Sequence, residues 1–159
     1  MGKPTKLTKE DLIKLGVTDV YKNGTVYVHG TKKSPRIVSV KHPYGKSCDY
    51  LVVSFQDYSV KYETIQTAKR KDGSIYRAPA WAYKVRNIPL GRVVLAWFTG
   101  SIEADEDADH IDGDTFNNNL DNLQKLSRKA NLAKRTLSWE DIAKIYRAKE
   151  KEKRTQEAD

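Results

Sequence analysis

Cysteine is nearly absent from this chain: among its 159 residues only Cys48 is present. A single thiol excludes an internal disulfide framework and a cysteine-rich structural zinc site. No stretch approaches the roughly 20 apolar residues that a membrane-spanning helix requires. Residues 1–6 also lack the apolar core of a secretory signal. We therefore expect a protein of a reducing cytoplasm, without membrane contact.

Acidic side chains are scarce over residues 1–101, where 18 Lys and Arg stand against 7 Asp and Glu. Basic side chains are missing from residues 102–124, which carry 8 acidic ones, and residues 125–159 are again basic. A basic body suits a polyanionic partner, because neutralised phosphates release condensed counterions. Lysines that only keep a protein soluble give the same net charge. An acidic island facing phosphate, however, requires a cation between the two.

The first half alternates with a period of two, which predicts a twisted antiparallel sheet after a short helix capped by Thr8. β-Branched and aromatic residues mark five extended stretches: residues 25–29, 36–40, 50–55, 60–65 and 74–85. Turn-forming residues separate them at 23–24, 43–45 and 72–73. Basic side chains in or near these turns are candidate contacts to a nucleic-acid backbone: Lys32, Lys33, Arg36, Lys69, Arg70, Lys71 and Arg77.

Helical periodicity returns after Pro89 and ends at Gly100. Residues 102–126 predict two short extended pieces around a polar loop, and Ser127 is a suitable N-cap for a basic helix. A last helix opens at Ser138 and leads into a charged tail. We expect the leucines of the hairpin and all three tryptophans to be buried: Leu120, Leu123, Leu126, Trp81, Trp97 and Trp139.

These patterns predict an α+β fold with three regions. Residues 1–86 form a basic, β-rich antiparallel region, and residues 87–136 a helix followed by a hairpin and a second helix. Residues 137–159 form a C-terminal helix and a charged tail. No dimerisation heptad is present, so we expect a monomer.

The segment from Asp109 to Asn131 carries the residues suited to chemistry. A hairpin folded over a helix brings a carboxylate, an imidazole and an amide oxygen to one place. Oxygen donors suit Mg²⁺ or Mn²⁺, with water and phosphate completing the ligand shell. A neutral imidazole such as His110 accepts a proton near physiological pH. This combination suits metal-assisted hydrolysis of a phosphodiester.

Other interpretations of the acidic segment are weaker. A calcium loop of the EF-hand type starting at Asp112 needs Gly at its sixth place and Glu at its twelfth, where this chain has Asn117 and Leu123. The acidic residues at 103–107 are more typical of a solvated turn. An isolated histidine such as His29 or His42 is usually structural or exposed.

The segment resembles the HNH endonuclease family, in particular its small phage-type homing members. The resemblance rests on the Asp-His-x-Asp-Gly-Asp start at 109–114, the Asn pair at 117–118, and Asn122 and Asn131 at the family's spacing from His110. It is specific over residues 102–134 and weaker over 90–98. The final family position is Asn here rather than His.

The resemblance implies a ββα-metal unit in which His110 is the general base and Asp109 and Asn131 hold one divalent metal, Mg²⁺ or Mn²⁺. Asn122 would bond across the hairpin loop to position His110. Double-stranded DNA would be cut to 5′-phosphate and 3′-hydroxyl ends, with one strand nicked, in a host or bacterial cytoplasm. Further DNA contacts would come from the basic helix: Arg128, Lys129 and Lys134.

Two alternatives stay open. One is a DNA-binding module that keeps an HNH scaffold without turnover. The other is an HNH nuclease that serves restriction or phage packaging.

Overall fold

The computed structural model describes residues 4–41, 47–134 and 139–158. The α+β fold is confirmed, with antiparallel strand pairs throughout the described part of the chain. The elements in chain order are β1 Leu7–Thr8, α1 Lys9–Lys14, β2 Val17–Val20, β3 Val26–Val28, β4 Thr31–Lys33, β5 Arg36–Lys41, β6 Ser47–Lys69, β7 Ile75–Pro89, α2 Leu90–Thr99, β8 Ser101–Ile102, β9 Glu106–His110, the 3₁₀ turn η1 Leu120–Asn122, β10 Leu123–Ser127, α3 Arg128–Lys134 and α4 Trp139–Ala158. None of the described helices is both long and apolar enough to cross a membrane.

The N-terminal elements form a small body around α1. Thr8 caps this helix as expected: its hydroxyl accepts from the Asp11 amide at 3.1 Å, and the Asp11 carboxylate accepts from the Thr8 amide at 3.0 Å. The strands β2, β3 and β4 form an antiparallel sheet beside α1, and β1 pairs with β8 from the second half of the chain. The pairing of β1 with β8 joins the N-terminal segment to the segment that precedes the site.

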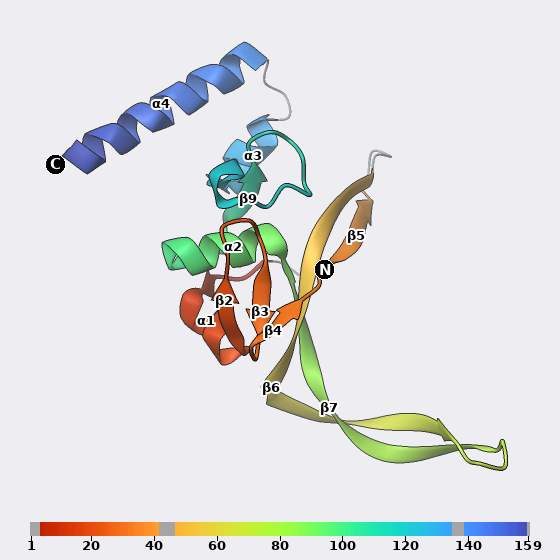
Figure 1. Ribbon diagram of the computed structural model, residues 1–159. Helices are drawn as coiled ribbons and strands as arrows, with labels where there is room; N and C mark the ends of the chain where they lie inside the picture. The colour runs from red at the N-terminus through yellow and green to blue at the C-terminus, as the bar shows by residue number, and fades with distance from the viewer. Residues whose placement is uncertain (1–3, 42–46, 135–138, 159) are drawn as a thin grey trace.

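The strands β5, β6 and β7 form a second antiparallel sheet, of which β6 and β7 are far longer than the others. The pairing of β6 with β7 shifts register between Asp57 and Lys61, a β-bulge that bends the hairpin. Beyond the bulge, residues 58–83 form a two-stranded ribbon that projects away from the body (Figure 1). We refer to residues 58–83 as the distal arm. The turn expected at residues 43–45 lies outside the described residues.

The distal arm overturns one prediction about the core. Trp81 was expected to be buried, but it lies on the arm and is 62% exposed. No residue from 56 to 87 is buried. Alternation of apolar and polar residues normally marks a strand with one covered face, but here both faces of the ribbon lack a covering layer. Trp97 packs partly buried against the core, and the side chain of Trp139 lies outside the described side chains.

The helix α2 is the centre of the hydrophobic core and sits directly behind the site. Its buried face packs with residues from both halves of the chain, among them Leu12, Phe55, Ile102 and Leu123. The expected boundary between residues 86 and 87 therefore separates two regions that share one core. Leu123 and Leu126 are buried and Leu120 is partly buried, which confirms the predicted hairpin core.

Arg92, in α2, is a buried residue whose guanidinium fastens three backbone segments. It donates to the carbonyl oxygens of Thr5 at 2.9 Å and Glu103 at 3.1 Å, and to that of Glu106 at the start of β9. Burial lowers the pKa of Arg92, opposed chiefly by the charge of Asp107. The guanidinium remains charged, and its hydrogen bonds to the backbone carbonyl oxygens fix the position at which β9 begins.

The C-terminal helix α4 extends to Ala158. It includes the charged stretch that we expected to lie beyond it as a tail. Residues 147–156 are rich in Lys, Glu, Arg and Ala, all good helix formers, and their charges recur at helical spacing. The expected capping residue Ser138 lies outside the described residues.

Candidate active site

The site is built on a hairpin of β9 and β10 backed by α3. The two strands pair so that His110 lies opposite Leu123 and Asp109 opposite Gln124. Ser127 begins α3 as predicted, since its hydroxyl accepts from the Ala130 amide at 3.1 Å. Neighbouring side chains on a strand point to opposite faces, so Asp109 faces α3 while His110 faces the loop.

His110, at the end of β9, is held by Asn118 in a way that assigns its ring protons. The Asn118 amide nitrogen donates to the Thr115 carbonyl at 3.3 Å, which leaves Oδ1 as the atom 3.0 Å from Nε2 of His110. A carboxamide oxygen only accepts, so Nε2 of the neutral ring carries the hydrogen. Nδ1 is then the nitrogen that can take a proton. Asn118 is 5% exposed, so this anchor is sheltered.

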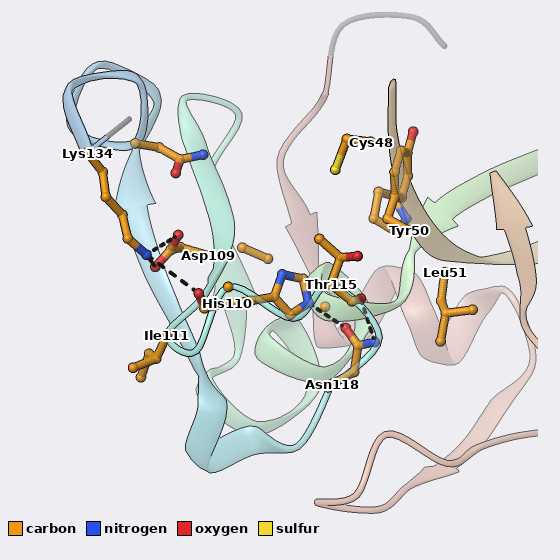
Figure 2. A pocket seen from close by; sticks show the side chains of 14 residues that line it. Cys48, Tyr50, Leu51, Asp109, His110, Ile111, Thr115, Asn118 and Lys134 are labelled. Atoms are coloured by element: carbon orange, nitrogen blue, oxygen red, sulfur yellow. Dashed lines mark hydrogen bonds and ion pairs between the residues drawn. The ribbon is translucent and has the colours of Figure 1, made fainter. Parts of the chain in front are cut away.

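Asp109 is a carboxylate that is almost fully enclosed, at 8% exposure. Its Oδ2 accepts from Gln124 Nε2 at 2.8 Å, and Lys134 Nζ lies 2.9 Å from Oδ1 and 2.8 Å from Oδ2. A buried carboxylate stays charged only with partners of this kind. Lys134 was predicted as a DNA contact, and the structure places it against Asp109 instead (Figure 2).

Asn131 reaches the same region from α3. Its amide nitrogen donates to Asp107 Oδ2 at 3.1 Å, which makes the amide oxygen the acceptor end of the side chain. Arg128, another predicted DNA contact, also binds Asp107, with a nitrogen 3.4 Å from Oδ1. Asp107 lies two residues before Asp109 on the same face of β9, so it orients α3 toward the site.

Asn122 closes the loop that follows His110. Its oxygen accepts from the Asp112 amide at 3.1 Å, and its nitrogen donates to Asp112 Oδ1 and to the Asn117 carbonyl, each at 2.9 Å. Donation from the Asn117 side chain, and then from Asn122 and the Asp114 amide, holds the pKa of Asp112 below its usual range. Asp112 is thus the ionised hub of the loop beside His110.

The loop is also tied to the N-terminal region. The Leu120 amide donates to the Lys22 carbonyl at 2.7 Å, and the Thr115 hydroxyl donates to the carbonyl of Asp49 in β6. Gly91 of α2 lies so close that a Cβ there would sit 3.2 Å from Ala108 and 3.4 Å from Asn118 Oδ1. A Cβ at this position would require Ala108 to move by a few tenths of an ångström, so glycine suits the close approach of α2 to the site.

An open cavity of about 640 Å³ lies over these residues. It is lined by Asp109, His110, Asn118, Asn131 and Lys134, and by Tyr50 and Leu51 of β6 on the opposite wall (Figure 2). Three of the predicted site residues thus share one cavity, and Asn122 supports the loop beneath it. The cavity is open enough to admit an extended polymer backbone.

The remaining predicted DNA contacts lie elsewhere. Lys32 and Lys33 lie in β4, Arg36 in β5, and Lys129 is exposed on α3. The others lie at the tip of the distal arm: Lys69, Arg70, Lys71 and Arg77. The basic residues therefore divide between the arm and the body.

The donors suit a single hard cation. Among the described residues there is no group of three or more His, Cys, Asp and Glu side chains that could hold a metal. One carboxylate and one amide oxygen instead meet at the cavity, which suits an ion that keeps several waters, such as Mg²⁺. In the structure the ammonium of Lys134 lies against both oxygens of Asp109.

Sequence reasoning noted Asn118 only as part of the Asn pair, placed Asp107 in a solvated turn and did not single out Gln124; the structure instead pairs Asp107 with Asn131 and Arg128. Period-two alternation along β9 carries a signal for Asp107, because it shares the face of Asp109. The roles of Asn118 and Gln124 depend on the loop path and on the hairpin register, which no local pattern shows.

A β-hairpin backed by a helix, with Asp-His at the strand end and Asn on the helix, is the ββα arrangement that the sequence resemblance implies. Residues 90–133 match the family model described as HNH endonuclease. The match includes α2, the whole hairpin and all four predicted site residues. No curated protein and no solved structure matches the chain.

Proposed function

We propose that this protein is a metal-dependent DNA endonuclease that hydrolyses phosphodiester bonds of double-stranded DNA at the cavity around His110. The observation that carries the proposal is the contact of His110 Nε2 with Asn118 Oδ1, which leaves Nδ1 as the nitrogen available to act as a base in a cavity that Asp109 and Asn131 also line. A base, a cation position and an open cavity are what such a hydrolysis requires.

In the proposed reaction, Nδ1 of His110 takes a proton from water as the water oxygen attacks phosphorus. The bond from phosphorus to the 3′ oxygen breaks, and solvent returns a proton to that oxygen. The products are 5′-phosphate and 3′-hydroxyl ends. Asn118 holds the ring, and Asn122 holds the loop after it. Asp109 and Asn131 are the proposed ligands of one Mg²⁺ or Mn²⁺, which when bound stabilises negative charge on the phosphate and leaving oxygen.

The distal arm supports DNA as the substrate. Its register places Lys61, Lys69, Arg77 and Trp81 on one face and mainly uncharged side chains on the other. Nine paired positions beyond the bulge span about 30 Å at ~3.3 Å per residue, close to one turn of the double helix. A two-stranded ribbon fits the major groove. We propose that the basic face of the arm lies against DNA while the cavity engages the backbone.

A homing-type role with strand nicking by a monomer is the finer form of the proposal, and it rests on the family resemblance. Nicking is tested by following supercoiled plasmid over time. Nicked circles should accumulate before any linear product. Linear product without a preceding nicked species would contradict nicking.

The central experiment compares plasmid cleavage by the wild type and His110→Asn with Mg²⁺ or Mn²⁺, with EDTA as a control. Loss of the base should slow cleavage by about 10²- to 10⁴-fold and leave DNA binding nearly unchanged. His29→Asn is the matched control, since His29 is exposed with φ +50°, a conformation that Asn tolerates. Wild-type cleavage by His110→Asn would refute the assigned base.

The alternative is a DNA-binding module without turnover. It predicts retention of DNA in gel-shift assays and no cleavage of any substrate in Mg²⁺ or Mn²⁺. One contact favours this alternative: the ammonium of Lys134 binds the Asp109 carboxylate that a metal would need.

A further inference from the structure

Lys134 is the last residue of α3 and extends across to β9. Its ammonium lies 2.8 and 2.9 Å from the two carboxylate oxygens of Asp109 and 3.5 Å from the His110 carbonyl oxygen. The Lys134 side chain is 21% exposed, and that of Asp109 is 8% exposed. Lys134 follows Asn131 by three residues, so both lie on one face of α3 and line the same cavity. Figure 2 shows the lysine reaching over the carboxylate.

The contact has a cost for the proposed metal site. A divalent ion and an ammonium on the same carboxylate repel each other strongly at this spacing. Gln124 already donates to Oδ2, which limits the directions from which a second cation can approach. A metal can therefore bind Asp109 tightly only if the ammonium withdraws. With the ammonium in place, the metal must bind much more weakly.

The contact between Lys134 and Asp109 also stabilises the metal-free protein. A nearly buried carboxylate without a counter-charge is strongly destabilising. In the protein without metal, Lys134 supplies that charge and orients the Asp109 carboxylate. Its four-carbon stem allows the ammonium to move away from the carboxylate without moving α3.

We propose that Lys134 is an exchangeable resident cation: it holds Asp109 in the metal-free protein and yields that carboxylate to the divalent metal. This inference rests on the proposed function only in taking Asp109 as a metal ligand. Lys134 is then a positioning residue for the metal site rather than a base or a ligand. Metal affinity is set by the exchange, and removal of the lysine raises it.

The test measures Mn²⁺ binding to the full chain without DNA, by isothermal titration and by the loss of the free-ion electron paramagnetic resonance signal. Lys134→Met keeps the length of the stem and removes the charge. We expect its dissociation constant for Mn²⁺ to fall about tenfold, equivalent to ~1.4 kcal/mol. Lys129→Met, on the exposed side of the same helix, should leave the Mn²⁺ affinity within about twofold of the wild type.

A second measurement, the rise in melting temperature on adding Mn²⁺, remains valid even when the variant is less stable than the wild type. A ligand that binds only the folded state raises the melting temperature, and at a given ligand concentration the rise is larger for tighter binding. Mn²⁺ should therefore raise the melting temperature of Lys134→Met more than that of the wild type, even if the variant starts lower. Lys134→Arg, which keeps the charge, should bind Mn²⁺ no more tightly than the wild type.

The outcomes separate the two proposals. Mn²⁺ affinity that is unchanged or weaker in Lys134→Met, but lost in Asp109→Asn, would overturn the exchange and leave the metal site intact. No Mn²⁺ binding by any of these proteins, or equal binding by the wild type and Asp109→Asn, would overturn the metal site itself. Binding by Lys134→Met that the wild type lacks would be the strongest support for the exchange.

Discussion

Asn118→Ala tests whether the anchor of His110 contributes to catalysis. In the resting protein the bond from Nε2 to Oδ1, at 3.0 Å, joins two neutral groups and is worth about 1 kcal/mol. When Nδ1 takes a proton the ring becomes cationic, and a hydrogen bond to a charged group is worth about 1.5–3 kcal/mol. The gain of about 0.5–2 kcal/mol in the transition state corresponds to a rate factor of about 2–30.

We therefore expect kcat for Asn118→Ala to fall by about 2- to 30-fold, with KM and Mn²⁺ affinity close to the wild type. Single-turnover cleavage of a labelled duplex measures the rate, and titration of Mn²⁺ without DNA measures the affinity. Asn119→Ala is the matched control, because Asn119 is exposed and its side chain donates to Asn117 rather than to His110. It should cleave within about twofold of the wild type.

A purely structural role for Asn118 predicts that the cleavage rate, the Mn²⁺ affinity and the stability fall together. A direct bond between Asn118 and His110 predicts instead that a double-mutant cycle of Asn118→Ala and His110→Ala, measured by urea unfolding, gives a coupling energy of about 1 kcal/mol. Zero coupling, or a loss of rate matched by an equal loss of Mn²⁺ affinity and stability, would refute the reasoning. Wild-type kcat in Asn118→Ala would refute it as well.

Three further predictions concern the frame of the site. Arg92→Met should lower the free energy of unfolding by about 2–4 kcal/mol, because three carbonyl oxygens lose a charged donor; urea denaturation measures this, and a loss no larger than that of Arg77→Met on the exposed arm would contradict it. The lowered pKa of Asp112 means that its carboxylate stabilises the loop above its unfolded pKa of about 3.9 and loses that effect as pH falls through the lower folded value. The difference in melting temperature between the wild type and Asp112→Asn should therefore shrink below about pH 4, and a constant difference would exclude this role. Arg77→Met should reduce the slope of log affinity against log salt by about one phosphate contact; an unchanged slope in DNA-binding titrations would remove Arg77 from the interface.

Much of the local structure could be predicted because its causes are local. The cap at Thr8, the start of α3 at Ser127 and the buried leucines of the hairpin follow from side chains within a few residues of one another. The family match lies over the same segment as the motif, because that segment carries its chemistry at fixed spacing.

The distal arm could not be predicted from its residues. Ile65, Ile75 and Trp81 are apolar, as in a covered strand, but they are 67%, 70% and 62% exposed. Whether another layer covers a strand depends on the path of the rest of the chain. The same holds for Lys134: its charge predicted a contact with DNA, and only the approach of α3 to β9 brings it to Asp109.

The burial pattern of the distal arm has a consequence for how such a protein can change over evolution. Since no residue from 56 to 87 is buried, substitutions there leave the core around α2 untouched and typically alter stability by no more than about 0.5 kcal/mol. Under the proposed function, selection can therefore vary the arm surface that contacts DNA while the core around α2 and the residues lining the cavity stay constant. The target of the proposed nuclease can then change through single, individually tolerated substitutions.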